Sequence, residues 1–289
     1  MPDWSAIISQ LETAGVRPLP AATPSTVSGG DISSAWRLAT ENGDLFIKTG
    51  PASSAEMFDA EAEGLTELAS TDAIRVPNVV ASGQTELSAY LGLEWMSFER
   101  ADAATERLFG EQLATLHHTT QNRYGWHRNN TIGLTPQENT WRDNWLDFFR
   151  EQRLGFQLRL AAENGYSGEL QQRGRQLLKR LPVYFDVAEP AASLLHGDLW
   201  GGNWGCSGGQ PVIFDPAVYY GDREMDIAMT KLFGGFGAEF YAAYESSWPL
   251  QDGHQERQHL YQLYHVLNHL NLFGSAYLGH AVRLLEKLH

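Results

Sequence analysis

Apolar residues recur every three or four positions in several stretches of the chain, which is the spacing of helices with one buried face. The first such stretch, residues 4–14, carries Trp4, Ile7 and Leu11 on one side and ends before Gly15. The same spacing predicts further helices over residues 55–69, 103–119, 141–160, 168–181 and 261–273. Most of the predicted helical residues therefore lie in the later part of the chain.

Short runs of strand-forming residues are concentrated before residue 97. Residues 26–48 predict three strands, the first two joined by a Gly-rich turn and the last two by the hairpin turn Asn42-Gly43-Asp44. Residues 75–80 and 91–96 predict further extended segments. Residues 124–139, where Gly, Asn and Pro accumulate, are expected to form a loop.

The change from strand to helix patterns divides the chain near Ser97. We predict an α+β fold with an N-terminal lobe, residues 1–96, built on an antiparallel sheet with one main helix. A larger and mostly helical lobe, residues 97–289, would follow. A length of 289 residues suits two such lobes, and a hydrophobic content of 43% supports a substantial core.

Charge and cysteine content restrict the possible partners. The net charge of −14 argues against nucleic acid and anionic membranes, which bind basic surfaces. We see no signal peptide and no apolar run of transmembrane length, and expect a cytoplasmic protein, most simply a monomer. The single cysteine, Cys206, permits no internal disulfide and is expected to be a small packed residue.

The residues with the clearest chemistry lie between Leu194 and Asp215. His196-Gly197-Asp198-Leu199 is followed by Asn203, and the apolar pair 212–213 leads to Asp215. This is the protein-kinase catalytic-loop pattern His-x-Asp-Leu-x-x-x-Asn, with Gly in place of its Arg. In phosphoryl transfer one carboxylate orients the attacking hydroxyl, while an amide oxygen and a second carboxylate hold Mg²⁺. We therefore predict Asp198 as the base, and Asn203 and Asp215 as metal ligands.

The N-terminal lobe carries residues suited to binding ATP. Gly29 and Gly30 could place backbone N–H groups over phosphates, and Lys48 could reach the α and β phosphates from the next strand. Glu61, on the helix that follows, is the expected partner of Lys48. Taken singly, the Gly-rich hairpin is better explained as a structural turn and Lys48 as a solvated strand end, and a surface charge is the alternative for Glu61.

The strand over residues 91–96 would lead to the hinge between the lobes. Its backbone groups are then candidates for binding the adenine edge, and the residues concerned are Glu94, Trp95 and Met96. A plain buried strand is the alternative.

Several polar residues downstream have two readings. Asp226 is a candidate helix N-cap and a candidate buried carboxylate that braces the backbone of the catalytic loop, and both roles can hold together. Glu224 is a candidate to face the substrate, whereas Asp222 is expected in a solvated loop. Asn268 and Asn271 interrupt an apolar helix face and are either fold braces or pocket groups.

The chain resembles one known family, the fructosamine kinases or ketosamine-3-kinases, which belong with the aminoglycoside phosphotransferases. The resemblance spans nearly the full length. It rests on the segments 56–58, 113–117, 136–141, 153–154, 196–203, 214–217, 220–222, 232–236 and 267–274. The combination of His-Gly-Asp-Leu-Trp-x-Gly-Asn with Phe-Gly-Gly-Phe is specific to this family.

This resemblance implies a bilobal, protein-kinase-like fold and ATP-dependent phosphorylation of the sugar 3-hydroxyl of a ketosamine, a deglycation-type repair activity. Trp200 would then lie against the sugar, and ATP and Mg²⁺ would be the cofactors. Some members carry a cysteine in the phosphate loop that permits a redox-linked dimer, but this chain has none between Thr26 and Lys48. An aminoglycoside or amino-alcohol phosphotransferase and a non-catalytic pseudokinase are the alternatives.

Overall fold

The computed structural model describes residues 2–27, 33–185 and 189–288 of the chain. Its residues form two compact units, 1–101 with 205–215 and 102–204 with 216–289. From the sequence we placed one boundary near Ser97. The first unit runs a few residues further and also takes in residues 205–215.

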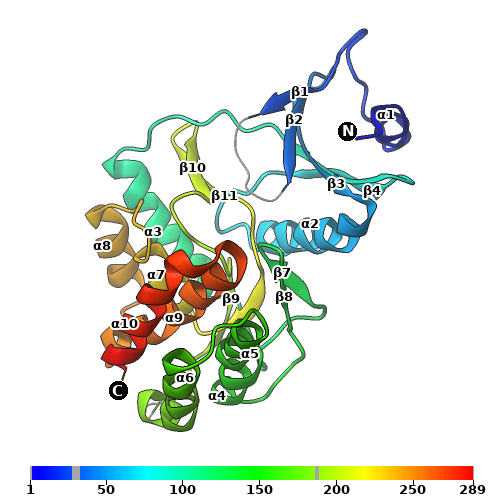
Figure 1. Cartoon of the computed structure of the whole chain (residues 1–289). Helices are drawn as coiled ribbons and strands as arrows, with labels where there is room; N and C mark the ends of the chain where they lie inside the picture. The colour runs from blue at the N-terminus through cyan, green and yellow to red at the C-terminus, as the bar shows by residue number, and fades with distance from the viewer. Residues whose placement is uncertain (1, 28–32, 186–188, 289) are drawn as a thin grey trace. The chain divides into compact units, whose positions relative to one another are not determined.

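The first unit is built on an antiparallel sheet (Figure 1). In the described residues its five strands lie in the order β1-β2-β3-β5-β4. Their bounds are β1 Ser25–Val27, β2 Ser34–Leu38, β3 Leu45–Pro51, β4 Val79–Gln84 and β5 Ser88–Glu94. The helices are α1 Trp4–Thr13 and α2 Ala55–Ser70, preceded by the short 3₁₀ helix η1 Ala52–Ser54. The predicted hairpin turn between β2 and β3 is present, and Gly43 adopts a positive φ of 108° there.

Strand β3 contributes apolar side chains to one face of this sheet and Lys48 to the other face. Side chains alternate across a strand, so neighbours face opposite ways. Ile47 packs with Leu11 of α1 and Tyr90 of β5 in a buried cluster. Lys48, the next residue, reaches Glu61 of α2 on the other side. The apolar face thus anchors the strand that holds the lysine.

Residues 205–215 join the first unit through backbone hydrogen bonds. They contain most of the hairpin β10 (Trp204–Ser207) and β11 (Gln210–Ile213). The Ile213 N–H donates to the carbonyl of Arg75 at 3.0 Å, and the Glu99 N–H donates to that of Cys206 at 2.9 Å. Cys206 itself is buried, as expected for a packed residue.

The second unit is mostly helical (Figure 1). Its helices are α3 Ala103–His117, α4 Trp145–Phe148, α5 Gly155–Glu163, α6 Glu169–Arg180, α7 Glu224–Thr230, α8 Ala238–Ser247, α9 His254–Phe273 and α10 Leu278–Lys287. Shorter turns are η2 Phe149–Leu154, η3 Leu181–Phe185 and η4 Ser275–Tyr277. The strands are β6 Thr120–Gln121, β7 Asn130–Ile132, β8 Thr135–Gln137, β9 Ala192–Leu195 and β12 Tyr219–Gly221. Strands β12, β9 and β6 form one small sheet, with β9 in the middle.

Two predicted elements of this unit differ from the structure. The loop expected over residues 124–139 contains the hairpin β7–β8. The single helix expected over residues 141–160 starts at Trp145 and is interrupted by the π-helical turn η2. There the Gly155 N–H bonds to the carbonyl of Arg150, and a side chain on Gly155 would approach that oxygen to 2.3 Å. Apolar spacing alone does not reveal such a turn.

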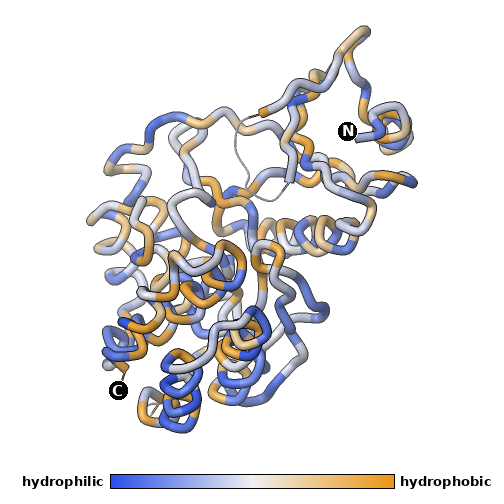
Figure 2. Tube along the Cα trace, viewed as in Figure 1, coloured by the Kyte–Doolittle hydropathy of each residue, from blue (hydrophilic) through white to orange (hydrophobic). Residues whose placement is uncertain are grey.

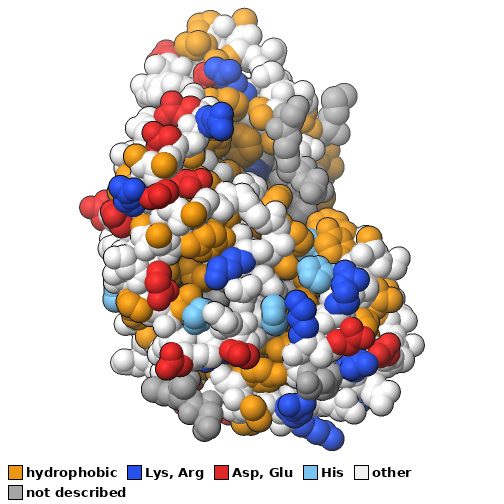
Figure 3. Space-filling model, turned by 90° about the vertical axis from the view of Figure 1, so that its left-hand side faces the viewer, with side chains coloured by type: hydrophobic (Ala, Val, Ile, Leu, Met, Phe, Trp, Pro, Cys, Tyr) orange, Lys and Arg blue, Asp and Glu red, His pale blue; other side chains and the backbone are white. Residues whose placement is uncertain are grey.

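The helices present polar surface outward in the usual way. Blue, hydrophilic residues run along α6 (Figure 2), whose buried residues are only Leu170, Gly174 and Leu177. On the face drawn in Figure 3, basic side chains lie among acidic ones. In the described part of the chain, no helix combines the length and the apolar character needed to cross a membrane.

Candidate active site

Three residues of the first unit form an ionic cluster around a buried lysine. The Lys48 Nζ lies 2.6 Å from Glu61 Oε1 and 2.7 Å from Asp215 Oδ1. Lys48 is only 7% exposed. Burial by itself lowers the pKa of Lys48, but the charges of Asp215 and Glu61 outweigh it and raise that pKa above its ordinary value. The ammonium group is therefore charged near neutral pH.

Asp215 is held in an unusual backbone conformation. Its φ is 57°, a left-handed value that residues other than glycine rarely adopt. The preceding Phe214 packs on Phe98 with ring centroids 5.2 Å apart. Backbone strain of this kind is found where a side chain must be aimed. The ion pair of Lys48 with Glu61 was expected from the sequence, whereas the direct contact of Lys48 with Asp215 was not.

The predicted hinge residues lie at the end of β5. The side chain of Glu94 accepts hydrogen bonds from Arg75 and Asn78, so it belongs to a local ion-pair cluster. The Glu94 N–H donates to the carbonyl of Asn78 and the Trp95 N–H to that of Asp44. Met96, the third of these residues, is 9% exposed. Gly29 and Gly30 lie outside the described residues.

In the second unit, Asp198 and Asn203 contact each other across the catalytic loop. The Asn203 Nδ2 donates to the Asp198 carbonyl at 2.9 Å and to its Oδ2 at 3.3 Å. Asn203 is buried, whereas Asp198 is partly exposed. The donating nitrogen turns the amide so that Asn203 Oδ1 is the atom suited to a cation.

Gly197 explains why the loop lacks the arginine of protein kinases. Its φ is 83°, and a side chain there would approach the Ala217 carbonyl oxygen to 2.0 Å. The Ala217 N–H in turn donates to the carbonyl of His196 at 2.8 Å. Any residue larger than glycine would push these two segments apart.

Asp226 braces the backbone of the catalytic loop. Its two carboxylate oxygens accept the N–H groups of His196 at 2.8 Å and Gly197 at 2.9 Å. Helix α7 begins at Glu224, so Asp226 lies in its first turn rather than at the N-cap. Burial works against the Asp226 carboxylate, but hydrogen bonds from His117 and Gly197 outweigh it and lower its pKa. Of the two expected readings, the structure therefore shows the brace.

His117 completes this brace as a buried neutral ring. Its Nε2 lies 3.2 Å from Asp226 and its Nδ1 lies 2.7 Å from the Tyr244 hydroxyl. Burial lowers the pKa of His117. A neutral ring that donates from Nε2 and accepts at Nδ1 satisfies both partners.

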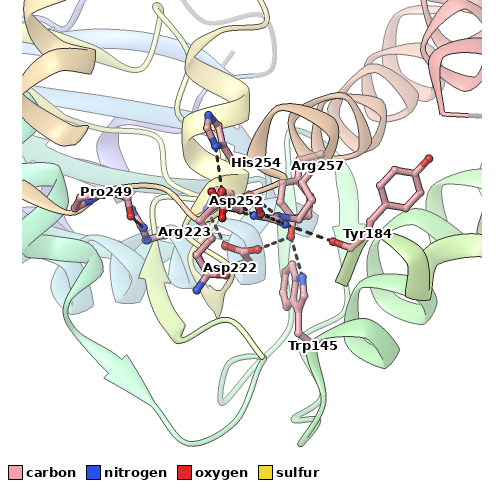
Figure 4. A network of polar contacts seen from close by, with 11 residues as sticks. Trp145, Tyr184, Asp222, Arg223, Pro249, Asp252, His254 and Arg257 are labelled. Carbon is pink, nitrogen blue, oxygen red and sulfur yellow. Dashed lines mark hydrogen bonds and ion pairs between the residues drawn. The ribbon is translucent and has the colours of Figure 1, made fainter. Parts of the chain in front are cut away.

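A second buried network fixes the start of α7 (Figure 4). Both oxygens of Glu224 accept from Arg257 of α9 at 2.8 Å, and Glu224 is 5% exposed. Asp222 accepts from the Tyr261 hydroxyl at 2.5 Å and from the Glu224 N–H at 3.0 Å. Burial and the neighbouring Glu224 raise the pKa of Asp222 to about 7.

This network changes two expectations drawn from the sequence. The expected solvated loop at Asp222 is wrong, because that carboxyl is 4% exposed and internally bonded. Glu224 was expected to face a substrate, but it is 5% exposed and both of its oxygens accept from Arg257, which favours a structural role. In the sequence, Glu224 lies between Asp222 and Asp226, and nothing in that pattern indicates that it pairs with the distant Arg257.

Asn268 and Asn271 act as braces between helices. Asn271 Nδ2 donates to the carbonyl and Oε1 of Gln157 at 3.0 and 2.8 Å, and its Oδ1 accepts from Asn164. Asn268 Oδ1 accepts from Gln157 at 3.1 Å. These contacts favour the fold-brace alternative for both, including Asn271, which we had also considered for the substrate.

Sequence reasoning missed Gln137, which positions the segment after Asp215. Its Nε2 donates to the carbonyl of Ala217 at 3.0 Å, and its Oε1 accepts from the Tyr264 hydroxyl at 2.7 Å. Gln137 is 2% exposed and lies on the hairpin that we had taken for a loop. A hairpin signal there would have been needed to find it.

Trp200 projects from the catalytic loop beside the Gly-rich turn that follows α7. It is 38% exposed, and its ring centroid lies 6.5 Å from that of Phe233. Asp198 and Trp200 are close in the loop, since the Trp200 N–H bonds to the Asp198 carbonyl at 3.2 Å. An aromatic face is therefore available next to the predicted base.

The site residues thus fall into two groups. Lys48, Glu61 and Asp215 meet in the first unit, and Asp198, Asn203 and Trp200 share one loop of the second. Within the described residues, no group of three or more His, Cys, Asp or Glu side chains is arranged to bind a metal ion.

Comparison with known proteins identifies the fold and the family. Residues 3–289 match the family model described as fructosamine kinase. A protein of Synechocystis sp. named probable ketoamine kinase is 42% identical over 286 residues, covering 98% of this chain and 96% of that protein. The chloroplastic protein-ribulosamine 3-kinase of Arabidopsis thaliana is 40% identical over 267 residues, 90% of this chain and 81% of that protein.

Solved structures agree with these sequence matches. A fructosamine-3-kinase candidate from Haemophilus somnus superposes with a TM-score of 0.89 at 29% identity, over 99% of this chain and 97% of that one. An ADP-bound aminoglycoside phosphotransferase has a TM-score of 0.64 at 13% identity, over 99% and 98% of the chains, and shares the fold alone. The expected kinase-like fold is confirmed, and the chain belongs to the fructosamine kinase family.

Proposed function

We propose that this protein transfers the γ-phosphoryl group of ATP to the 3-hydroxyl of a ketosamine. The observation that carries the proposal is the match, over almost the whole chain, to proteins named ketoamine kinase and protein-ribulosamine 3-kinase. The Lys48 cluster and the Asp198 loop would supply the residues that such a transfer needs. Kinase-like fold and relatives together imply that the phosphoryl donor is ATP.

The first unit would bind the nucleotide. Lys48, oriented by Glu61 and Asp215, would contact the phosphates, and Gly29 and Gly30 would add backbone N–H groups. Adenine needs one acceptor and one donor along its edge. The N–H groups of Glu94 and Trp95 already bond within the protein. We therefore propose the Glu94 carbonyl as the acceptor for adenine and the Met96 N–H as the donor.

Asn203 and Asp215 would hold Mg²⁺. Both offer oxygen atoms, the ligands that Mg²⁺ prefers, and Mg²⁺ in kinases takes only one or two protein ligands with phosphate oxygens and waters completing its shell. The bound ion would neutralise charge on the phosphate oxygens. The contact of Lys48 with Asp215 places a second positive group beside the same carboxylate.

Asp198 would act as the base. The proton of the 3-hydroxyl passes to the Asp198 carboxylate as the sugar oxygen bonds to the γ-phosphorus. The bond from that phosphorus to the β–γ bridging oxygen breaks, and ADP leaves with both electrons of that bond. Trp200 would contact the apolar face of the sugar, and Asp226 would keep the loop in place.

A substrate panel tests this proposal. Ketosamines of one amine with six-, five- and four-carbon sugars, and the aminoglycoside kanamycin, would each be incubated with ATP, Mg²⁺ and the purified chain. We expect ADP release with at least one ketosamine and a phosphate on its O3 by NMR. Turnover of kanamycin alone would indicate an aminoglycoside kinase, and tight ATP binding without any turnover would indicate a pseudokinase.

A further inference from the structure

Five aromatic side chains of the second unit form a row that starts at the catalytic loop. We call Trp200, Phe233, His269, Phe273 and Tyr277 the aromatic row. Ring centroids lie 6.5 Å apart for Trp200 and Phe233, and 4.8 Å apart for Phe233 and His269. His269 is 5.5 Å from Phe273 and 5.2 Å from Tyr277. The rings are therefore in continuous contact over residues that are far apart in sequence.

The row lies at the surface although its members are mostly large and apolar. Trp200, Phe233 and Phe273 are 38%, 41% and 49% exposed. A single exposed aromatic residue is ordinary, but connected ones beside a reactive group usually mark a binding surface.

Glycines bring the first two members of the row together. Gly201 follows Trp200, and a side chain on it would approach the Gly234 carbonyl oxygen to 2.9 Å and the Gly235 Cα to 3.1 Å. Only a glycine permits this backbone approach. The turn after α7 consequently lies against the catalytic loop and holds Phe233 next to Trp200. His269 and Phe273 are one turn apart on α9 and face the same side.

His269 gives the row one hydrogen-bond acceptor. Its Nδ1 lies 2.8 Å from the His265 carbonyl oxygen, which can only accept, so Nδ1 carries the proton. Burial lowers the pKa of His269, so the ring is neutral at pH 7. In the neutral ring with a proton on Nδ1, Nε2 is an acceptor.

We propose that the aromatic row binds the amine carrier of the ketosamine: its secondary ammonium group and the alkyl chain that follows. This inference rests on the proposed function, which places the sugar at Asp198 and Trp200. The ketosamine nitrogen is attached to C1, two carbons from the hydroxyl at C3. Once that hydroxyl reaches Asp198, the nitrogen and its substituent lie next to Trp200 and continue along the row.

Beyond Trp200, which would also contact the sugar, the chemistry of the row fits an ammonium group followed by an alkyl chain. Aromatic faces attract an ammonium group and also cover alkyl carbons, as they do for lysine side chains. A neutral imidazole nitrogen accepts the N–H of that ammonium. A carrier shaped like the lysine side chain, with a cation followed by methylene groups, uses each of these features.

A series of fructosamines and ribulosamines made from methylamine, butylamine and hexylamine tests the proposal. Binding of each to the full chain without ATP would be followed by tryptophan fluorescence, and turnover with ATP would be measured in parallel. We expect the hexylamine adduct to bind about tenfold more tightly than the methylamine adduct. In a Phe273→Ala/Tyr277→Ala double variant this ratio should fall to about two.

Leu134→Ala is the matched control, because Leu134 is a 59% exposed apolar residue at the tip of the β7–β8 hairpin. It should keep the full chain-length ratio. Equal binding of the three adducts by the unchanged protein, or an unchanged ratio in the double variant, would overturn the carrier site. A preserved ratio in binding with no turnover of any adduct would support the row and instead overturn the proposed kinase activity.

Discussion

The two units hold their functional side chains in opposite ways. In the first, the Lys48 ammonium group donates to both Glu61 and Asp215, and Lys48 is almost fully buried. In the second, Asp198 is partly exposed, and its loop is held through backbone N–H groups that bond to the buried Asp226. The first arrangement keeps the Lys48 side chain charged, and the second fixes the position of the loop that carries Asp198.

The difference follows from what each group is proposed to do. A lysine that contacts phosphate acts through its charge, which is strongest where water is excluded. A base must be reached by the hydroxyl that it deprotonates, so its own carboxylate cannot be sequestered in an ion pair. Substitutions in the two units should therefore lower activity for different reasons. In the first unit the cause would be the loss of a charge, and in the second it would be the displacement of the catalytic loop.

Removing the positive charge of Lys48 should lower activity more than substitutions of the buried carboxyl groups around α7. In Lys48→Met, we expect kcat/KM for ATP to fall about 10³-fold, because the phosphates lose a positioned positive group. Steady-state kinetics with a ketosamine measures this. Lys179→Met, which removes an exposed lysine on α6, should change little. An Lys48→Met enzyme with near-normal kcat/KM would show that the cluster is structural only.

Loosening the loop should lower turnover without weakening ATP binding. In Asp226→Asn, the amide nitrogen replaces one of the two oxygens that accept backbone N–H groups, so we expect kcat to fall about 10²-fold. The KM for ATP should stay within about threefold, which distinguishes loss of position from loss of nucleotide affinity. The exposed Asp147→Asn is the control. A large rise in KM with an intact kcat would contradict the positional account.

The anchor of α7 should appear mainly in stability. Glu224→Gln leaves Arg257 as a buried guanidinium without its carboxylate, and we expect the free energy of unfolding to drop by about 3 kcal/mol. Chemical denaturation measures this. Glu239→Gln, at the exposed pair with Arg107, should cost much less, because solvent screens that pair. Equal costs for the two variants would mean that burial does not strengthen the Glu224 pair.

Asp222 should give a smaller effect that depends on pH. Its pKa is raised to about 7 in the folded protein by burial and by Glu224, so the folded state binds a proton that the unfolded state releases near pH 4. Stability from this group is therefore present at low pH and is lost as pH rises toward 7. From pH 5 to 8, the unfolding free energy should fall by roughly 2 kcal/mol more than in Asp222→Asn. Parallel pH curves for the two proteins would contradict the shift.

The sequence predicted the elements better than the contacts that join them. Apolar periodicity predicted α2, α3 and α9, and the sequence motif pointed to Asp198, Asn203 and Asp215. The sequence also indicated that Lys48 pairs with Glu61, because the alternation of side chains along β3 and the helical spacing of α2 determine which way these two side chains point.

Contacts between distant segments could not be predicted in this way. Arg257 lies 33 residues from Glu224, and Gln137 lies 80 residues from Ala217. The partners of Arg257 and Gln137 depend on how α9 and the β7–β8 hairpin pack against the rest of the unit. The apolar pattern within a single element does not predict this packing. For the same reason Asp222 was expected in a solvated loop and Glu224 was expected to face the substrate, whereas both are buried in the structure.

The most direct measurement is single-turnover phosphoryl transfer by Asp198→Asn, with ATP binding measured on the same preparation. With Asp198 as the base, transfer to a ketosamine should slow about 10³-fold while the Kd for ATP changes less than about threefold. Transfer at a rate close to that of the unchanged protein would contradict the account, because the hydroxyl would then lose its proton without this carboxylate.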